Sequence, residues 1–309
     1  MQNCLVCGRT VNKIAGAVIA PWIRELSNID SQQHTEFLKC SSRGFCFFEH
    51  RYTESEMLGL YENYRSSNYF HIRRNWEPWY SNKEIVAYTA ESDRLGLSAR
   101  KRFMDTCIRS AGLHYKDFSS CVDFGGDLGQ FFPEEIAGKK YILDPSERPL
   151  INDDIVRIAE LSEIGHEVDL VLNCHTLEHL GDFQGEIEKI YSVLKTGGVL
   201  YLEVPFDIFK TSRLHKLKAY SRYLGLLERW KFCFILMDFM SGVYRQFFNR
   251  VPFFGLVKQS EHINYFTLNS LEFLLVKNGF ELKPGGQVDA NWKQGRLKLG
   301  RMSVIGVKR

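Results

Sequence analysis

A glycine-containing turn between two acidic residues is the first feature of this sequence that can bind a ligand. Asp123 opens the run Asp-Phe-Gly-Gly-Asp-Leu-Gly, which ends at Gly129, and Asp144 ends the next predicted strand. Glycines let a backbone approach a ligand closely, and a helix N-terminus offers unpaired N–H groups to a carboxylate or phosphate. A carboxylate after the following strand can accept both hydroxyls of a ribose. The pattern predicts a nucleotide-type site.

The order of the glycines separates two ligands that the spacing fits equally, NAD and S-adenosylmethionine. A dinucleotide fingerprint requires G-x-G-x-x-G. Neither Gly125 nor Gly126 begins one, because Asp127 and Leu128 occupy the following positions. The sequence therefore lacks the glycines of the tight turn that binds the pyrophosphate of NAD. An NAD-dependent oxidoreductase is disfavoured for this reason.

Four cysteines near the N-terminus form a candidate metal site. Cys4-x-x-Cys7 is a zinc half-site, and Cys40 with Cys46 would supply the other half, although Arg43 stands where a regular knuckle has its fourth thiol. Four thiolates leave no open position on zinc, so the metal would be structural. The alternative is a degenerate knuckle whose cysteines stay reduced, as in a cytoplasmic protein.

Two histidine motifs could also do chemistry. His175-x-x-Glu178-His179 reads in isolation as a zinc peptidase signature. It begins at the end of a predicted parallel strand without a convincing third ligand, so a structural or cofactor-lining role is favoured. Glu261-His262 is a carboxylate–imidazole pair in which the histidine can act as a base near neutral pH.

The elements that must position these residues alternate between strands and helices. The composition, 44% hydrophobic and 25% charged over 309 residues, is that of a packed protein, and a net charge of +3 does not argue for nucleic acid. Alternation of this kind predicts βαβ units and a parallel sheet that ends in an antiparallel edge hairpin. The predicted strands are 121–124, 141–143, a short one before Ala159, 168–172, 198–204, 280–283 and 302–307. Helices are predicted over 54–118, 186–194 and 268–277, and Gly197-Gly198 is expected to end the second of them.

Basic charge is concentrated in one aromatic-rich segment, 206–260. From Lys210 to Lys258 there are ten Lys or Arg against two acids, Glu228 and Asp238. The segment could be a solvated helical lid, a cap that holds the diphosphate of a nucleotide-linked or lipid-linked sugar, or a helix whose apolar part, 230–237, rests on anionic lipid. The cap is the favoured interpretation. No apolar run reaches the roughly 20 residues of a membrane span. A cytoplasmic protein is expected, with contact at the inner face of the membrane left open.

Four segments, in the right order over 119–205, resemble the motifs of class I S-adenosylmethionine-dependent methyltransferases. The run from Asp123 to Gly129 is similar to the first motif, and Tyr141-Ile-Leu-Asp144 to the second. The segment 169–180 resembles the fourth-strand motif of the small-molecule branch, and 194–200 the turn before strand five. Asp127 stands where the family usually has its middle glycine, and Asp tolerates a left-handed backbone better than most residues.

The resemblance implies an α/β fold and a cofactor site. The fold would be a Rossmann-like seven-stranded sheet, mostly parallel with an antiparallel last strand, beside a small Cys-rich N-terminal module and a helical insertion. S-adenosylmethionine would be the cofactor. Asp123, Gly125, Gly126 and Gly129 would hold its methionine end, Asp144 its ribose, Ala159 or Glu160 its adenine, and Asn173 and His175 would close the site from the fourth strand.

The N-terminal module resembles the zinc-binding segment of sugar C-methyltransferases from polysaccharide clusters. In that family the pair that corresponds to Glu261 and His262 borders the acceptor pocket, with the histidine as base. The acceptor would be a sugar, nucleotide-linked or in a surface glycan, methylated at carbon or oxygen. The expected organisation is 1–50 Cys-rich module, 51–118 helical linker and 119–309 methyltransferase core with the insertion at 206–260. A non-catalytic scaffold in a polysaccharide pathway is the alternative.

Overall fold

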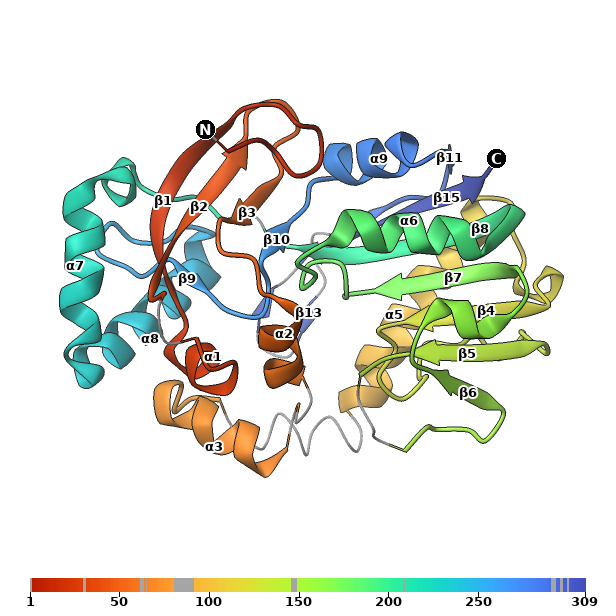
Figure 1. Ribbon diagram of the computed structural model, residues 1–309, viewed down its shortest axis with the longest axis horizontal. Helices are drawn as coiled ribbons and strands as arrows, with labels where there is room; N and C mark the ends of the chain where they lie inside the picture. The colour runs from red at the N-terminus through yellow and green to blue at the C-terminus, as the bar shows by residue number, and fades with distance from the viewer. Residues whose placement is uncertain are drawn as a thin grey trace. The chain divides into compact units, whose positions relative to one another are not determined.

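The chain folds into two compact units, each built from segments that are distant in the sequence. The computed structural model describes residues 2–29, 32–61, 64, 66–80, 92–145, 149–207, 209–289, 293–294, 297–298 and 300–309. The first unit comprises 1–85, 207–266 and 295–298, and the second comprises 86–206, 267–294 and 299–309 (Figure 1). Each unit is described by itself.

The second unit is built on a mostly parallel sheet. Its strand order is β11-β15-β8-β7-β4-β5-β6, with β12 also paired to β15. Neighbours from β6 to β8 run parallel, whereas β15 runs antiparallel to β8, β11 and β12. This confirms the expected Rossmann-like sheet with an antiparallel last strand. The strands are β4 Ser120–Phe124, β5 Lys139–Leu143, β6 Ile155–Ile158, β7 Val168–Cys174, β8 Leu194–Phe206, β11 Phe280–Lys283, β12 Val288–Asp289 and β15 Gly300–Lys308.

Polar side chains cap two α-helices of this unit, and one of the two runs directly into the next strand. The helices of the unit are α5 Ser92–Ser110, η1 Tyr115–Asp117, η2 Leu161–Ile164, α6 Phe183–Val193 and α9 Leu268–Lys277. The Asp182 side chain caps α6 by accepting from the Gly185 N–H at 3.0 Å. The backbone turns from helix to strand at Leu194, because this buried residue is extended and pairs with Val168. Gly197 and Gly198 therefore lie within β8 and do not end the helix.

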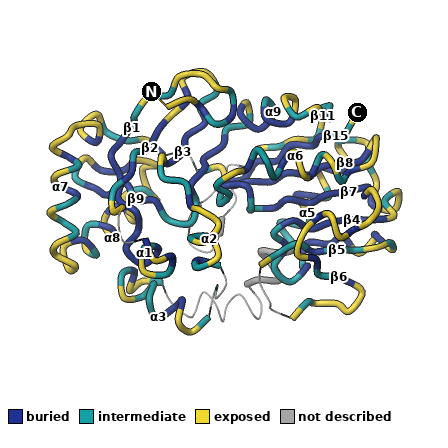
Figure 2. The backbone as a smooth tube through the Cα atoms, in the orientation of Figure 1, coloured by how far each residue is buried: buried dark blue, intermediate teal, exposed yellow. Residues whose placement is uncertain are grey.

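The core of the second unit lies on both faces of the sheet. Every residue of β7 is buried, as expected for a parallel strand that is covered on both sides (Figure 2). Cys107 and Ile108 of α5 pack against Leu170, Leu172 and Tyr201 in one apolar cluster. The carboxyl ends of β4, β5 and β7, where Asp123, Asp144 and Asn173 stand, are thus fixed by a continuous core.

The first unit is built on a smaller, mixed sheet whose strands come from both ends of the unit. The strands are β1 Val11–Ile19, β2 His34–Cys40, β3 Cys46–Phe48, β9 Lys258–Gln259 and β10 Asn264–Tyr265, in the order β10-β3-β2-β1-β9. β1 pairs parallel with β9, and the other neighbours are antiparallel. The N-terminal segment and the end of the insertion therefore share one sheet.

Helices surround this smaller sheet. They are α1 Pro21–Leu26, α2 Glu54–Tyr61, α3 Ser67–Trp76, η3 Arg213–Lys216, α7 Lys218–Glu228 and α8 Lys231–Phe248. The predicted helical region 54–118 contains α2, α3 and α5, and its part 81–91 lies outside the described residues. Two short strands, β13 Lys293–Gln294 and β14 Leu297–Lys298, complete the elements. None of the helices described here has the length and apolarity to cross a bilayer.

Candidate active site

The glycine turn after β4 depends on its left-handed residues and on the absence of side chains. Gly125, Asp127 and Gly129 have φ values of 77°, 53° and 80°. A Cβ on Gly125 would lie 2.1 Å from the Thr176 hydroxyl, and one on Gly126 would lie 2.3 Å from the Asp123 carboxylate. Neither contact is sterically allowed. Asp127 takes the left-handed conformation expected of it, so the turn survives without the usual middle glycine.

Asp123, at the end of β4, is a buried carboxylate that no described residue pairs. Its exposed fraction is 0%, and neither carboxylate oxygen has a hydrogen-bond partner among the described residues. Burial, and then the charge of Asp144, raise its pKa to about 7. Such a group is costly unless a ligand completes it. A cationic donor, such as the ammonium of an amino-acid ligand, fits this position.

Asn173 is a second buried polar side chain without a hydrogen-bond partner in the described part of the chain. It stands on β7 opposite Phe124 of β4, and both polar atoms of its amide are unpaired within the described chain. An amide can donate and accept at once. Asp123 and Asn173 thus provide one charged acceptor and one neutral donor–acceptor on adjacent strands, as an amino-acid ligand requires.

Asp144 and Glu160 are engaged in local backbone contacts. Asp144 Oδ2 accepts from the Asp127 N–H at 2.9 Å, which ties the end of β5 to the glycine turn. Glu160 is exposed and caps η2, with its side chain accepting from the backbone of Glu163. Both residues lie after consecutive strands of the sheet, where the resemblance places ribose and adenine contacts.

His175 is anchored to the neighbouring strand by a residue that the sequence did not single out. Its Nε2 lies 3.0 Å from Glu203 Oε1, and the Tyr201 hydroxyl donates to Glu203 Oε2 at 2.6 Å. Burial, then the charge of Arg100, lower the pKa of His175 to about 4. Burial alone would raise the pKa of Glu203, but the hydrogen bond from His175 and nearby positive charge hold it at about 2. A neutral His175 donating to ionised Glu203 has a structural role.

Glu178 occupies the centre of the His175–His179 motif. Its carboxylate is 1% exposed, and Oε1 lies 3.7 Å from a ring nitrogen of each histidine. Burial raises its pKa to about 8, so this acid is largely protonated at neutral pH. A protonated carboxyl can donate a hydrogen bond, which suits a site lining better than a general base.

The first unit contains a polar cavity that includes both predicted catalytic residues. Its volume is about 200 Å³, and α8, β9 and the segment that follows β9 form much of its wall. Glu261 and His262 line it together. The other polar and charged residues of the lining are Asp207, Asp238, Ser241, Arg245, Lys258, Ser260 and Tyr265.

The charged groups of this cavity are paired with one another. Lys258 Nζ lies 2.6 Å from Glu77 Oε1 and also contacts Asp238, and Arg245 contacts Asp207. Burial opposes the charge of Lys258, but Asp238 and Glu77 raise its pKa above the usual range. The cavity therefore has fixed charges that nearly cancel.

Glu261 is held in place by α3. Its Oε1 accepts from the Tyr69 hydroxyl at 2.5 Å and from Arg73 Nη1 at 3.1 Å. The Arg73 guanidinium lies 3.8 Å from the ring centroid of Tyr80 and 4.3 Å from that of Trp22. No local pattern indicates this support, because Arg73 and Glu261 are far apart in the chain.

The predicted cofactor residues and the predicted catalytic residues therefore belong to different units. Asp123, Asp144, Asn173 and His175 lie with the glycine turn at the carboxyl ends of strands in the second unit. Glu261 and His262 share the cavity of the first unit.

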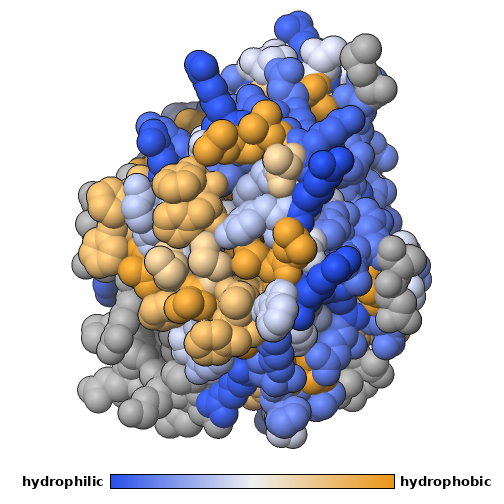
Figure 3. All heavy atoms as spheres, turned by 90° about the vertical axis from the view of Figure 1, so that its left-hand side faces the viewer, coloured by the Kyte–Doolittle hydropathy of each residue, from blue (hydrophilic) through white to orange (hydrophobic). Residues whose placement is uncertain are grey.

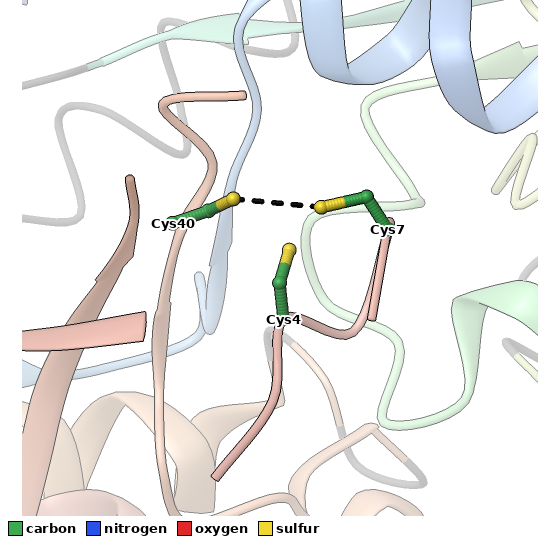
Figure 4. A group of neighbouring side chains, drawn as sticks. All are labelled: Cys4, Cys7 and Cys40. Carbon is green, nitrogen blue, oxygen red and sulfur yellow. Dashed lines mark hydrogen bonds between the residues drawn. The ribbon is translucent and has the colours of Figure 1, made fainter. Parts of the chain in front are cut away.

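Three of the four predicted metal ligands come together in the first unit. The sulfurs of Cys4, Cys7 and Cys40 lie within 4.8 Å of one another, and the Cys7 and Cys40 sulfurs are 3.6 Å apart (Figure 4). Burial acts to raise the pKa of Cys40, but the backbone N–H groups of Arg43 and Ser42 lower it. Three converging thiols, of which Cys40 has a lowered pKa, fit a zinc ion whose fourth ligand would come from elsewhere.

Cys46 lies outside this group. It begins β3, where it pairs with Lys39, and its thiol donates to the Gly44 carbonyl at 3.4 Å. Burial raises the pKa of Cys46 to about 12, so it remains a thiol. The structure thus brings together three of the predicted ligands and not the fourth, because the register of β3 directs Cys46 elsewhere.

Comparisons with known proteins agree with this architecture. The family model described as "Methyltransferase domain" matches residues 97–283. No curated protein matches the chain. The solved structures that resemble it do so remotely, and at these TM-scores they carry no argument about the acceptor.

Three of these solved structures illustrate the range. A putative S-adenosylmethionine-dependent methyltransferase from Listeria monocytogenes is 14% identical, with 70% of this chain and 99% of that chain covered and a TM-score of 0.43. Magnesium protoporphyrin IX methyltransferase from Synechocystis PCC 6803, with bound SAH, is 15% identical (80% and 97% covered, TM-score 0.43). A possible histamine N-methyltransferase from Thermotoga maritima is 16% identical (74% and 98% covered, TM-score 0.37).

The family match, the sheet order and the buried acceptors at the ends of β4 and β7 lead to one conclusion. The matched region spans well over half of the chain. The protein belongs to the methyltransferase domain family and is an enzyme that uses S-adenosylmethionine as its methyl donor.

Proposed function

We propose that this enzyme methylates a hydroxyl-rich, sugar-type acceptor that binds in the cavity of the first unit, in the cytoplasm. The observation that carries the proposal is the lining of that cavity, where Glu261 and His262 stand among carboxylates, amines and hydroxyls. Ligand pockets for drug-sized molecules are mostly apolar and run from about 300 to 1,000 Å³. A polar cavity of about 200 Å³ suits one small hydroxylated ring.

The paired charges favour a neutral group inside the cavity. Lys258 and Arg245 are its two strong cations, and each already contacts one or two carboxylates. A diphosphate would have to displace these partners at a large desolvation cost. A sugar ring can instead exchange hydrogen bonds with the existing groups. The proposed nucleotide or lipid diphosphate would then lie outside the cavity, with its sugar inside.

His262 is the proposed base. Methyl transfer is an in-line displacement, so the enzyme mainly holds the acceptor at near-attack distance from the methyl group, about 3 to 3.5 Å. A hydroxyl or carbon acceptor must also lose a proton, and histidine has a suitable ordinary pKa for that transfer. Glu261, fixed by Tyr69 and Arg73, would orient the acceptor or the imidazole. Both O- and C-methylation are compatible with this arrangement.

The assigned roles of the cofactor residues are part of the same proposal. Asp123 and the turn 125–129 would hold the methionine moiety of S-adenosylmethionine, and Asp144 the ribose. Asn173 would close the site with its unpaired amide. His175 would act indirectly, by fixing the end of β7 against Glu203.

The test is a transfer assay with labelled S-adenosylmethionine and a panel of nucleotide sugars and lipid-linked sugars. We expect His262→Ala to lower turnover by about 10²- to 10⁴-fold, as for loss of a general base, without changing affinity for the demethylated cofactor. His114→Ala, an exposed histidine of the second unit, is the matched control. Full turnover by His262→Ala would remove this residue from the mechanism.

We also propose that Cys4, Cys7 and Cys40 bind a structural zinc ion. Metal analysis of the purified protein should find one zinc ion per chain, which Cys40→Ser should lose and Cys46→Ser should keep. Equal zinc content in both variants would contradict the three-sulfur site, and no zinc in the wild type would dispose of it.

A further inference from the structure

Helix α8 has its polar residues facing inward. Phe234, Asp238 and Ser241 are its buried positions. Asp238 contacts Lys258, and the Ser241 hydroxyl accepts from the Leu256 N–H at 2.8 Å. Asp238, Ser241 and Arg245 also line the cavity. The side of α8 that packs on its own unit is therefore its more polar side.

The opposite side of α8 is apolar and faces solvent. Phe232 and Phe247 are each 77% exposed, and Leu236, Phe239 and Val243 are exposed between them at intervals of three or four residues. This spacing places them along one stripe of the helix. We call these five residues the outer face of α8. Figure 3 shows the left-hand side of Figure 1, where α7 and α8 lie, and apolar side chains are gathered on that side. Trp230 and Phe253, 69% and 63% exposed, are further exposed aromatic residues of the same segment.

The exposed charges of the segment that carries this face have a single sign. Within 210–253, all of which is described, eight Lys or Arg are exposed and no acid is. The two acids of the segment are withdrawn from the surface: Glu228 bonds to Arg24 at 2.8 Å, and Asp238 is buried. The exposed cations are Lys210, Arg213, Lys216, Lys218, Arg222, Arg229, Lys231 and Arg250.

We propose that the outer face of α8 docks on the surface of an anionic lipid bilayer. An apolar helix stripe in a segment whose exposed charges are all Lys and Arg has the composition of a helix that lies in the membrane interface. Anionic headgroups neutralise the cations while the acyl region covers the aromatic side chains. Because the inner side of α8 is polar, the helix must lie parallel to the membrane surface and cannot enter the acyl region with both sides. A second copy of this chain fits less well, because a symmetric contact would set the same cations against each other.

Docking would bring the bilayer close to the cavity. The outer face and the cavity lining are opposite sides of α8, so roughly one helix diameter, about 10 Å, separates lipid from the lining residues. In so far as the proposed function holds, this favours an acceptor sugar carried on a lipid. The docking itself does not depend on that function.

The experiment is co-sedimentation of the full chain with vesicles of phosphatidylcholine, with and without phosphatidylglycerol. We expect binding only to the anionic vesicles. Phe232→Ser/Phe247→Ser should weaken it by at least ten-fold, whereas Leu58→Ser, an exposed leucine of α2, should leave it unchanged. Lys218→Glu/Arg222→Glu should weaken it by about five-fold or more for each cation lost, and added salt should act in the same direction.

Three results would overturn the proposal. One is no binding of the wild type to anionic vesicles. Another is binding to these vesicles that neither double variant weakens. The third is a concentration-dependent dimer that Phe232→Ser/Phe247→Ser abolishes while vesicle binding stays absent, which would assign the face to a second copy. Sedimentation requires no acceptor and no turnover, so failure here and failure of the methylation proposal are separate outcomes. Thermal unfolding of each variant checks that it is folded.

Discussion

The two polar sites of this enzyme treat buried charge in opposite ways. In the second unit, Asp123 and Asn173 are fully buried with polar atoms that the described chain does not satisfy. In the first unit, Lys258, Arg245 and Arg73 each contact carboxylates beside the cavity. The first arrangement is incomplete until a charged ligand binds. The second is complete beforehand and suits a neutral acceptor, because fixed dipoles and charges need no reorganisation.

The difference also predicts how each site affects stability. A buried group without a partner lowers the stability of the ligand-free protein, so its removal should stabilise the fold while it weakens binding. A buried ion pair behaves in the reverse manner, since removing one partner leaves the other charge uncompensated. Substitutions at Asp123 and Lys258 should therefore change stability in opposite directions.

Loss of Lys258 should have the largest effect on stability. Lys258→Met leaves Glu77 and Asp238 buried without their cation, and should lower the free energy of unfolding of the first unit by about 3–5 kcal/mol. Tryptophan fluorescence during urea unfolding can measure this, because Trp22, Trp76, Trp79 and Trp230 belong to this unit. Lys258→Met/Asp238→Met should recover part of the loss. Unchanged stability of Lys258→Met would contradict the paired cavity.

Asp123→Asn should act in the opposite direction and depend on pH. The folded-state pKa is raised from 3.8 to about 7, so the folded protein keeps the proton longer than the unfolded chain. Stability therefore falls as the pH rises from 3.8 to about 7, and the cost, about 4 kcal/mol, is complete above that. Hydrogen exchange of the β4 and β7 amides at pH 8 should show that the Asp123→Asn variant opens less often than the wild type.

The same variant should bind the demethylated cofactor at least ten-fold more weakly, because an amide cannot replace the charge of the carboxylate. For the wild type, affinity should fall as the pH drops below about 7, where Asp123 becomes protonated in the ligand-free protein. Titrations at several pH values measure this. Affinity that is independent of pH, with no loss in the variant, would remove Asp123 from the cofactor site.

Asp127→Gly should have the smallest effect. Asp127 has φ 53°, where glycine is unstrained, and its N–H to Asp144 would be kept. We expect the free energy of unfolding to rise by no more than about 1 kcal/mol and cofactor affinity to stay within about three-fold. Asp127→Ala, whose Cβ opposes this conformation, should instead destabilise by roughly 1–2 kcal/mol. Equal effects of the two substitutions would show that the backbone conformation is unimportant.

The second unit was largely predictable because its information is local. The glycine turn follows its strand directly, and the strands 280–283 and 302–307 were predicted as the antiparallel hairpin that β11 and β15 form. Asp127 was predicted to tolerate the left-handed turn that it occupies. The start of β8 was missed, because the glycine pair at 197–198 is typical of a helix end, whereas Leu194 pairs with Val168.

The first unit was less predictable because distant segments assemble it. Its sheet joins 11–48 to 258–265, a pairing that no local pattern indicates. Arg73 and Tyr69 support Glu261 from another part of the chain, and the register of β3 keeps Cys46 apart from the other three N-terminal cysteines. The sequence also placed the apolar part of the insertion at 230–237. The exposed apolar stripe in fact continues to Phe247. The polar residues Asp238 and Ser241, which point inward, interrupt the apolar run in the sequence and hide this continuation.

The central claim is that the end of β4 and its glycine turn bind S-adenosylmethionine. Titrating the demethylated cofactor into the purified protein at pH 8, and NAD in parallel, tests it most directly. We predict a single saturable binding event for the demethylated cofactor, lost or much weakened in Asp123→Asn, and none for NAD. Binding of NAD alone, or binding of the demethylated cofactor with the same affinity in both proteins, would contradict it.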